Sequence, residues 1–357
     1  MTDLGTRPRP VAVPLAVSAS ARRLPRWAPL AALAAAAALA GGLLAVLGWS
    51  TAGFAVLVAL LSVVLLVGAS RAVEGSRKAT DRLVTALVTG AFLVALLPLM
   101  SLVWTVVRQG AARFDPEFFT WSMAGVVGAG GGAYHAILGT LVVTALATVI
   151  SVPVGLLTAV YLVEYGRGRL ARGITFLVDV MTGIPSIVAG LFAYALFTLV
   201  LGPGTRLGIM GAVALSVLMI PLVVRSTEEM LKLVPNELRE AAYALGVPKW
   251  LTVVKVVLRT AVGGIATGIT LAIARVIGET APLLVTLGIT TGTNLNPFAE
   301  RMATLPVFSY YQYTQPGVPP EPAIDRAWTA ALVLIILVML FNLLARLISR
   351  WFSPRAH

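Results

Sequence analysis

Long blocks of hydrophobic residues alternate with short polar segments along this chain. A bilayer core of about 30 Å is crossed by a helix of roughly 20 apolar residues. Runs of that length occur at 28–49, 51–69, 83–107, 136–163, 173–201, 207–224, 256–289 and 327–349. The pattern predicts an all-α polytopic membrane protein with about eight transmembrane helices. Five runs are interrupted by an internal proline, which spanning helices tolerate where neighbours re-satisfy the freed backbone groups: Pro98, Pro153, Pro185, Pro221 and Pro282.

The composition supports this fold class. Hydrophobic residues make up 58% of the 357 residues and charged residues 12%, and the mean hydropathy is +0.92. Soluble domains carry about 25% charged residues, so we expect one membrane domain rather than several soluble ones. The chain has no cysteine and only two histidines, which excludes disulfides and thiolate metal sites and leaves no basis for expecting a bound metal.

The basic residues predict the orientation of the chain. Its net charge of +12 does not indicate a nucleic-acid partner, because the basic residues are scattered between apolar blocks without interleaved aromatics. If both termini are cytoplasmic, the cytoplasmic segments hold 21 of the 27 Lys and Arg residues and the outer connections only five. Segment 1–27 is predicted to be a disordered cytoplasmic tail, followed at 28–69 by two uncleaved N-terminal spans.

The longest cytoplasmic connection, 225–259, reads as helix, break, helix. Pro235 suits a first helical turn, and Gly246 followed by Pro248 is typical of a helix end. Four residues at helical spacing form one apolar face between these points: Leu238, Ala241, Ala242 and Leu245. From periodicity alone, the helix either lies against lipid or docks on a partner.

The run 260–289 carries two charges inside the membrane. Helical spacing places small residues and both charges within about an 80° sector: Gly264, Gly268, Ala272, Arg275 and Glu279. An arginine at the bilayer centre costs about 2.5–3.5 kcal/mol, so it needs a partner, and Glu279 is one turn away. The two residues form either a packing salt bridge or a site where Arg275 binds an oxyanion that Glu279 orients or competes with.

The sequence Glu240-Ala241-Ala242, followed three residues later by Gly246, resembles the EAA loop of ABC importer permeases, although Arg259 stands where that pattern has proline. In that family the loop forms a short coupling helix seated on the ATP-binding subunit. The resemblance therefore implies that Glu240, Ala241, Ala242 and Gly246 contact an ATPase.

The stretch ARVIGETAPLL (274–284) resembles the signature of the permeases of phosphate-specific transport (Pst) systems, and more closely their A-type subunit. Further matching segments are GGGAYHAILGT, YLVEYGRG, GIPSIVAGLF, RSTEEMLKLVPNELREAAYALG and MATLPVFSYYQY. The resemblance covers about 83–350, where it implies a six-helix importer permease domain whose core lies at about 136–345. It implies alternating-access import of phosphate, with Arg275 and Glu279 on the substrate path.

Two further residues are candidates for that path. Asp179, near the cytoplasmic end of its span, is either a helix-end residue in the interface region or a second partner for a basic group. Thr280 is a possible hydroxyl donor to the substrate, although threonine in a membrane helix commonly bonds its own backbone.

The sequence contains no Gly-x4-Gly-Lys-Ser/Thr loop, so we expect ATP to be bound by a separate polypeptide. The resemblance implies two ATP-binding subunits carrying ATP and Mg, a homologous second permease, and an extracytoplasmic phosphate-binding protein that docks on 108–135 and 290–326. This chain would bind no cofactor, catalyse no reaction itself, and lie in the bacterial cytoplasmic membrane.

Two other functional classes compete with a phosphate permease. The first is a permease for another oxyanion, such as sulfate, molybdate or tungstate, which the EAA loop would serve equally well. The second is an anion channel or a membrane-embedded enzyme. A channel would not use the docking loop, and an enzyme would require paired catalytic groups that the sequence lacks.

Overall fold

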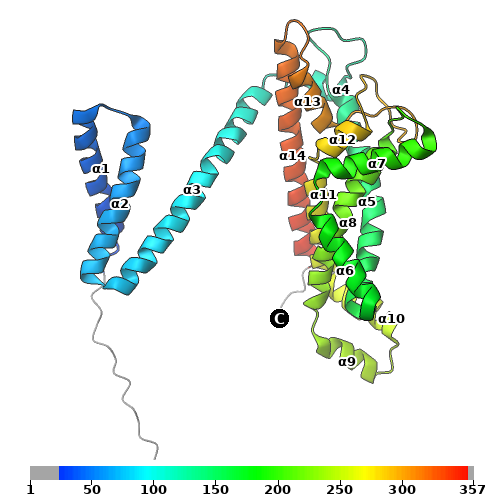
Figure 1. Cartoon of the computed structure of the whole chain (residues 1–357), viewed down its shortest axis with the longest axis horizontal. Helices are drawn as coiled ribbons and strands as arrows, with labels where there is room; N and C mark the ends of the chain where they lie inside the picture. The colour runs from blue at the N-terminus through cyan, green and yellow to red at the C-terminus, as the bar shows by residue number, and fades with distance from the viewer. Residues whose placement is uncertain (1–23, 353–357) are drawn as a thin grey trace, which may run out of the picture. The chain divides into compact units, whose positions relative to one another are not determined.

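The computed structural model describes residues 24–352, and their side chains up to residue 347 (Figure 1). Most of the predicted tail 1–27 lies outside the described residues. Within them, seven helices are long and apolar enough to cross a membrane, and a bent pair of helices provides an eighth candidate. The prediction of an all-α polytopic membrane protein is therefore confirmed. The chain divides into two compact units, residues 1–102 and 103–357, which are described separately.

The first unit contains a helical hairpin of α1 (Ala28–Leu47) and α2 (Thr51–Val73), followed by the first part of α3 (Ser76–Gly110). The turn between α1 and α2 is stabilised by Ser50, whose hydroxyl accepts a hydrogen bond from the Gly53 N–H at 3.2 Å. Ala36 and Ala40 are fully buried, so their small side chains lie within the packing of the hairpin.

A buried carboxylate joins the helices of this unit. Both oxygens of Glu74 accept hydrogen bonds, from the Leu24 N–H and the Ser70 hydroxyl, each at 2.9 Å. Arg82 forms an ion pair with the same carboxylate at 2.7 Å, and the Glu74 side chain is only 3% exposed. These contacts, above all the Leu24 N–H, lower the pKa of Glu74 below its ordinary value.

The second unit is built around α8 (Gly208–Lys232), which contacts α5 (Tyr134–Val160) and α11 (Leu258–Val276). α5 ends in a π-helical turn, η1 (Tyr161–Tyr165). α11 is preceded by α10 (Lys249–Thr252) and a second π-helical turn, η2 (Val253–Val257). Buried side chains from these helices form a common core, including Val143, Ala147, Leu215, Met219, Ala272 and Val276.

Short helices lie at both ends of this unit (Figure 1). α9 (Asn236–Ala244) lies at one end, and α4 (Pro116–Thr120), α12 (Ala281–Thr286) and α13 (Leu305–Thr314) lie at the other. The last helix, α14 (Glu321–Phe352), packs against α11 and α13. α13 begins on α5, because the Leu305 N–H donates to the hydroxyl of Thr140 at 2.8 Å.

Two of the predicted spans are not single straight helices in the structure. Run 173–201 is divided into α6 (Gly168–Thr182) and α7 (Ser186–Leu201), which are bent by 110° where Gly183 and Pro185 interrupt the helix. Run 256–289 contains a spanning helix over Lys249–Val276 and the separate α12. Gly278 and Pro282 account for this second break, because both residues disfavour continued helix.

Replacing Glu74 with alanine should release the segment at Leu24. The variant removes the acceptor of the Leu24 N–H hydrogen bond, so the Leu24 amide should exchange hydrogen faster. The pKa of Glu74 is lowered in the folded state, so the hydrogen bond from the Leu24 N–H to its carboxylate should be fully formed above the ordinary carboxyl pKa. It should be lost as the pH falls through the lowered pKa. Glu237→Ala at an exposed position is the control, and unchanged exchange in Glu74→Ala would contradict this role.

Candidate functional site beside two helix breaks

A cavity of about 230 Å³ lies in the second unit where two helix breaks meet the internal proline of α8. Its walls come from the α6–α7 break, from α8 around its internal proline, and from the end of α11. The lining residues are Met181, Thr182, Ile184, Ser186, Leu218, Pro221, Leu222, Arg275, Val276 and Glu279. Since one water occupies about 30 Å³ in the liquid, the cavity has room for a small hydrated anion.

The backbone explains why a cavity forms at this place. Pro221 lies inside α8 and has no N–H to donate, so the carbonyl one turn earlier loses its helical partner. The breaks at 183–185 and 277–280 free further backbone groups. Irregular backbone at membrane depth is tolerated only where it is buried in protein or lines a water-filled cavity. Grouping the two breaks with Pro221 of α8 lets one polar cavity serve the freed backbone groups of all three segments.

A close backbone contact brings two of the broken segments together. α7 crosses the start of α12 at Gly190, where a Cβ atom would lie only 2.6 Å from the Cα of Pro282. No side chain fits in that space, so glycine is required for the approach. The contact therefore joins the segments GIPSIVAGLF and GETAPLL, which lie about ninety residues apart in the sequence.

Arg275 and Glu279 both face this cavity, but not as the predicted helical pair. α11 ends at Val276, and the Glu279 N–H makes a tight turn by donating to the Val276 carbonyl at 3.1 Å. Glu279 therefore lies outside the helix that carries Arg275. Within residues 24–347 no ion pair joins the two side chains, so the prediction of a pair set by one-turn spacing was wrong. Both charged groups remain available to the cavity.

Arg275 is placed by a long regular helix. It is exposed and lies in the last turn of α11, where the negative end of the helix dipole favours a cation. It follows Arg259 by 16 positions in the same helix, or about 24 Å at 1.5 Å per residue. The predicted glycine face nearer the start of α11 packs on α8, with Gly264 against Met230 and Gly268 against Ser226.

The structure does not bring the other two candidates into the cavity. Asp179 in α6 forms an ion pair with Arg225 of α8, so it is the partner of a basic group, and Arg225 also pairs with Glu228 at 2.8 Å. Asp179 instead lines a second cavity of about 390 Å³. Thr280 precedes α12 without a side-chain capping bond and is not part of the lining of the Arg275 cavity.

The predicted coupling helix forms at the opposite end of the unit from α12. α9 begins after Pro235 and ends before Gly246, whose φ of 77° lies in the left-handed region that glycine adopts freely. Glu240 and Ala241 are exposed, whereas Ala242 is only 8% exposed. Leu245 is 83% exposed, so this chain leaves part of the predicted apolar face uncovered.

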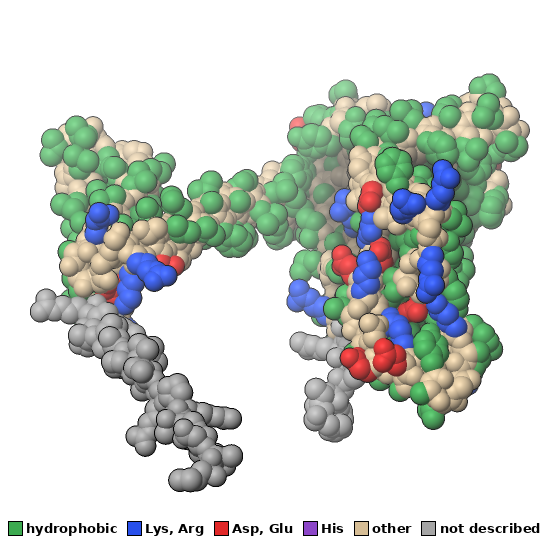
Figure 2. All heavy atoms as spheres, turned by 60° about the horizontal axis from the view of Figure 1, so that its bottom comes forward, with side chains coloured by type: hydrophobic (Ala, Val, Ile, Leu, Met, Phe, Trp, Pro, Cys, Tyr) green, Lys and Arg blue, Asp and Glu red, His purple; other side chains and the backbone are tan. Residues whose placement is uncertain are grey.

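Figure 2 turns the α9 end of the second unit toward the viewer. Basic and acidic side chains gather over this end, among hydrophobic surface on the flanks. An apolar residue exposed beside charged groups is found on protein docking surfaces and on helices that lie at a membrane surface.

Arg239 fixes α9 to two membrane helices. Its guanidinium donates to Glu164 of η1 at 2.8 and 3.1 Å, to the Leu231 carbonyl of α8 at 3.0 Å, and to the Val234 carbonyl at 2.7 Å. The Arg239 and Glu164 side chains are only 13% and 5% exposed. Sequence analysis missed this contact because 75 residues separate the partners, although each lies in a segment that resembles the Pst permeases.

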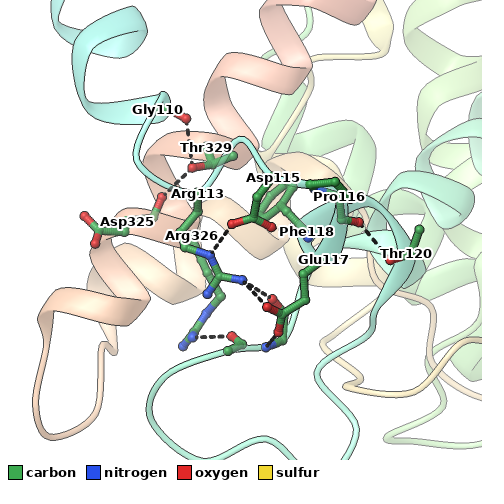
Figure 3. A network of polar contacts seen from close by, with 12 residues as sticks. Gly110, Arg113, Asp115, Pro116, Glu117, Phe118, Thr120, Asp325, Arg326 and Thr329 are labelled. Atoms are coloured by element: carbon green, nitrogen blue, oxygen red, sulfur yellow. Dashed lines mark hydrogen bonds and ion pairs between the residues drawn. The ribbon is translucent and has the colours of Figure 1, made fainter.

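A second network holds the loops at the α12 end (Figure 3). Arg113 pairs with Asp115 at 2.9 Å and with Glu117 at 3.5 Å, and donates to the Gly131 carbonyl at 2.9 Å. Asp115 caps α4, and the hydrogen bond from the Phe118 N–H is the main cause of its lowered pKa. Arg326, only 4% exposed, donates to Gly128 and Gly130 carbonyls at 2.8 and 2.9 Å.

Comparisons with known proteins agree with this arrangement. The model of the family described as binding-protein-dependent transport system inner membrane component matches residues 151–357, more than half of the chain. A crystal structure of a bacterial ABC transporter involved in the import of the acidic polysaccharide alginate has a TM-score of 0.52 and 13% identity, covering 78% of this chain and 100% of that chain. That likeness concerns the fold alone.

Curated relatives give a finer assignment. The phosphate transport system permease protein PstA 1 of Mycobacterium tuberculosis (strain CDC 1551 / Oshkosh) is 48% identical over 275 residues, which cover 76% of this chain and 89% of that protein. The phosphate transport system permease protein PstA of Yersinia pestis is 37% identical over 294 residues, covering 82% and 96%.

The fold, the interrupted helices and the family match define a membrane permease of a binding-protein-dependent transport system. Within that class, the chain belongs to the PstA family of phosphate transport system permeases. The resemblance found in the sequence is thereby confirmed.

Replacing Arg239 with alanine should destabilise the fold by about 3–5 kcal/mol, because it leaves Glu164 buried without a partner. The double variant Arg239→Met with Glu164→Leu should recover much of this loss, since apolar replacement of a whole buried pair is often neutral. Thermal unfolding of the purified protein measures both, with Arg172→Ala as an exposed control. If the single and the double variant lose equal thermal stability, a structural role for the pair is contradicted.

Proposed function

We propose that this chain is the permease subunit of an ATP-driven importer that moves inorganic phosphate across the bacterial cytoplasmic membrane by alternating access. Its membership of the PstA family and its importer-permease fold support this function. The chain is a multi-pass membrane subunit without a catalytic role of its own.

The observation that carries the substrate assignment is Arg275 in the cavity between broken helices. A guanidinium presents a planar fork of donors that matches two oxygens of an oxyanion. At membrane depth such a cation costs about 2.5–3.5 kcal/mol, and Arg275 has no ion-pair partner among residues 24–347. An anion entering the cavity would offset that cost, and Glu279 on the same wall would limit how long the anion stays.

The proposed complex contains several other chains. ATP and Mg would be held by two separate ATP-binding subunits, one of which docks on α9 through Glu240, Ala241, Ala242 and Gly246. A homologous second permease would form the other wall of the path. An extracytoplasmic phosphate-binding protein would dock on 108–135 and 290–326, the connections stabilised by the Arg113 and Arg326 contacts (Figure 3).

The proposed orientation places both termini in the cytoplasm. The Lys and Arg distribution supports it, because 21 of these 27 residues then lie on the cytoplasmic side. In this orientation α9 faces the cytoplasm and α12 lies toward the outside, since they occupy opposite ends of the unit. Closure of the ATP-binding subunits would move α9, and Arg239 would transmit the movement to α5 and α8.

Replacing Arg275 with glutamine should abolish phosphate uptake, because the neutral amide keeps much of the size but loses the charge that attracts the anion. Uptake of labelled phosphate by cells carrying the complete transporter is the measurement. Arg172→Gln, at an exposed cytoplasmic position, is the matched control. Normal uptake by Arg275→Gln at a normal level of assembled transporter would refute the substrate role.

Replacing Gly246 with aspartate should uncouple ATP hydrolysis from transport without unfolding this chain. Among the described residues other than its two chain neighbours, none has an atom within 4 Å of a Cβ placed there, and aspartate is among the residues that adopt left-handed backbone most readily. The added carboxylate would therefore act mainly on the docked ATPase.

Co-purification of the ATPase subunit and phosphate-stimulated ATP hydrolysis measure the effect of Gly246→Asp. Gly168→Asp is a close control, because Gly168 has a φ of 75° and no atom within 4 Å of its Cβ position. Equal coupling in the two variants would count against docking at Gly246.

A further inference from the structure

Two arginines converge near the outer end of α12, away from the cavity. Arg206 lies in the connection between α7 and α8, and Arg301 lies in the segment before α13. A Cβ atom built on Gly288 would lie 3.0 Å from Cδ and 3.2 Å from Nη1 of Arg206, and 3.3 Å from Cδ of Arg301. Atoms of both side chains thus lie within 3.3 Å of one point beside Gly288, which is buried.

The backbones that carry these arginines are firmly held. Arg301 is followed by Met302 and Ala303, which are 1% and 2% exposed, and its carbonyl accepts a hydrogen bond from the Asn294 side chain at 3.2 Å. Near Arg206, the Ile209 N–H donates to the Pro297 carbonyl at 2.8 Å, which fixes the start of α8 against the segment that carries Arg301. The two guanidinium groups therefore come from one rigid frame.

No carboxylate neutralises this pair. Across residues 24–347, neither Arg206 nor Arg301 forms an ion pair or side-chain hydrogen bond, although Arg206 is half-buried. The other close arginines of this end behave differently, because Arg113 pairs with two carboxylates and Arg326 donates to backbone carbonyls and to Gln312 (Figure 3). Two like charges held together without a counter-charge favour binding of an anion between them.

We propose that Arg206 and Arg301 form an outer oxyanion site that takes free inorganic phosphate or a similar tetrahedral anion. The two planar forks offer donors in the geometry that such an anion accepts. The role of the site as an entry station rests on the proposed function.

The position of α12 connects this pair to the cavity. α12 spans Ala281–Thr286, a length of about 9 Å at 1.5 Å per residue. Glu279 and the cavity precede it, and Gly288 with the two arginines follows it. An anion held at the outer pair would be one short helix away from Arg275.

The test is equilibrium binding of labelled inorganic phosphate to the purified complete transporter in nanodiscs, without the phosphate-binding protein. All variants carry Arg275→Gln, so that binding at the inner cavity is removed. In that background, adding Arg206→Gln and Arg301→Gln should weaken phosphate binding at least tenfold. Arg206→Lys with Arg301→Lys should retain part of the affinity, because the charges remain and the forks are lost.

Arg108→Gln is the control, because it removes an exposed charge from the last turn of α3. Unchanged phosphate binding in the double glutamine variant would overturn the proposal. A second outcome would also overturn it: phosphate binding is unchanged, but the second permease or the binding protein is retained less well. The arginines would then pair with carboxylates of those proteins. Normal uptake by the single Arg275→Gln variant would refute the inner path while leaving this site testable by the same binding assay.

Discussion

The structure of the second unit depends on one constraint, the need of every backbone N–H and C=O group within the membrane for a partner. Proline and glycine break the helices at 183–185 and at 277–280, and Pro221 leaves a backbone carbonyl inside the continuous helix α8 without its helical partner. Separately, each break would expose polar groups to hydrocarbon. Packed together, with Gly190 against Pro282, they surround one cavity. The same arrangement ends α11 just after Arg275 and directs that side chain into the cavity.

α8 links this cavity to the α9 end of the unit. Its middle supplies Pro221 to the cavity wall, Arg225 pairs with Asp179 of α6, and the carbonyl of Leu231 accepts from Arg239 of α9. Arg239 also holds Glu164 at the end of α5. A displacement of α9 therefore acts on two helices at once, and one of them lines the cavity. This is a physical route by which a movement of α9 can alter access to Arg275.

Periodicity and hydropathy sufficed for the fold class, for most spans and for α9 between Pro235 and Gly246, because these features depend on local sequence. They failed where a break redirects the chain. Hydropathy predicts one uninterrupted span for the run 173–201, yet the helices are bent by 110° at Gly183 and Pro185. The spacing of Arg275 and Glu279 assumed a helix that Gly278 and Pro282 end. Contacts between distant segments, such as Arg239 with Glu164, leave no periodic signal in one sequence.

The central claim, that phosphate enters the cavity beside Arg275, can be tested with a cysteine placed in its wall. The chain has no cysteine, so Thr182→Cys gives a single reactive thiol in a lining position. The measurement is the rate at which a water-soluble thiol reagent modifies it in the assembled transporter. Phosphate should slow the reaction, and this protection should vanish when Arg275 is also replaced by glutamine. Equal rates with and without phosphate in the presence of Arg275 would contradict the account.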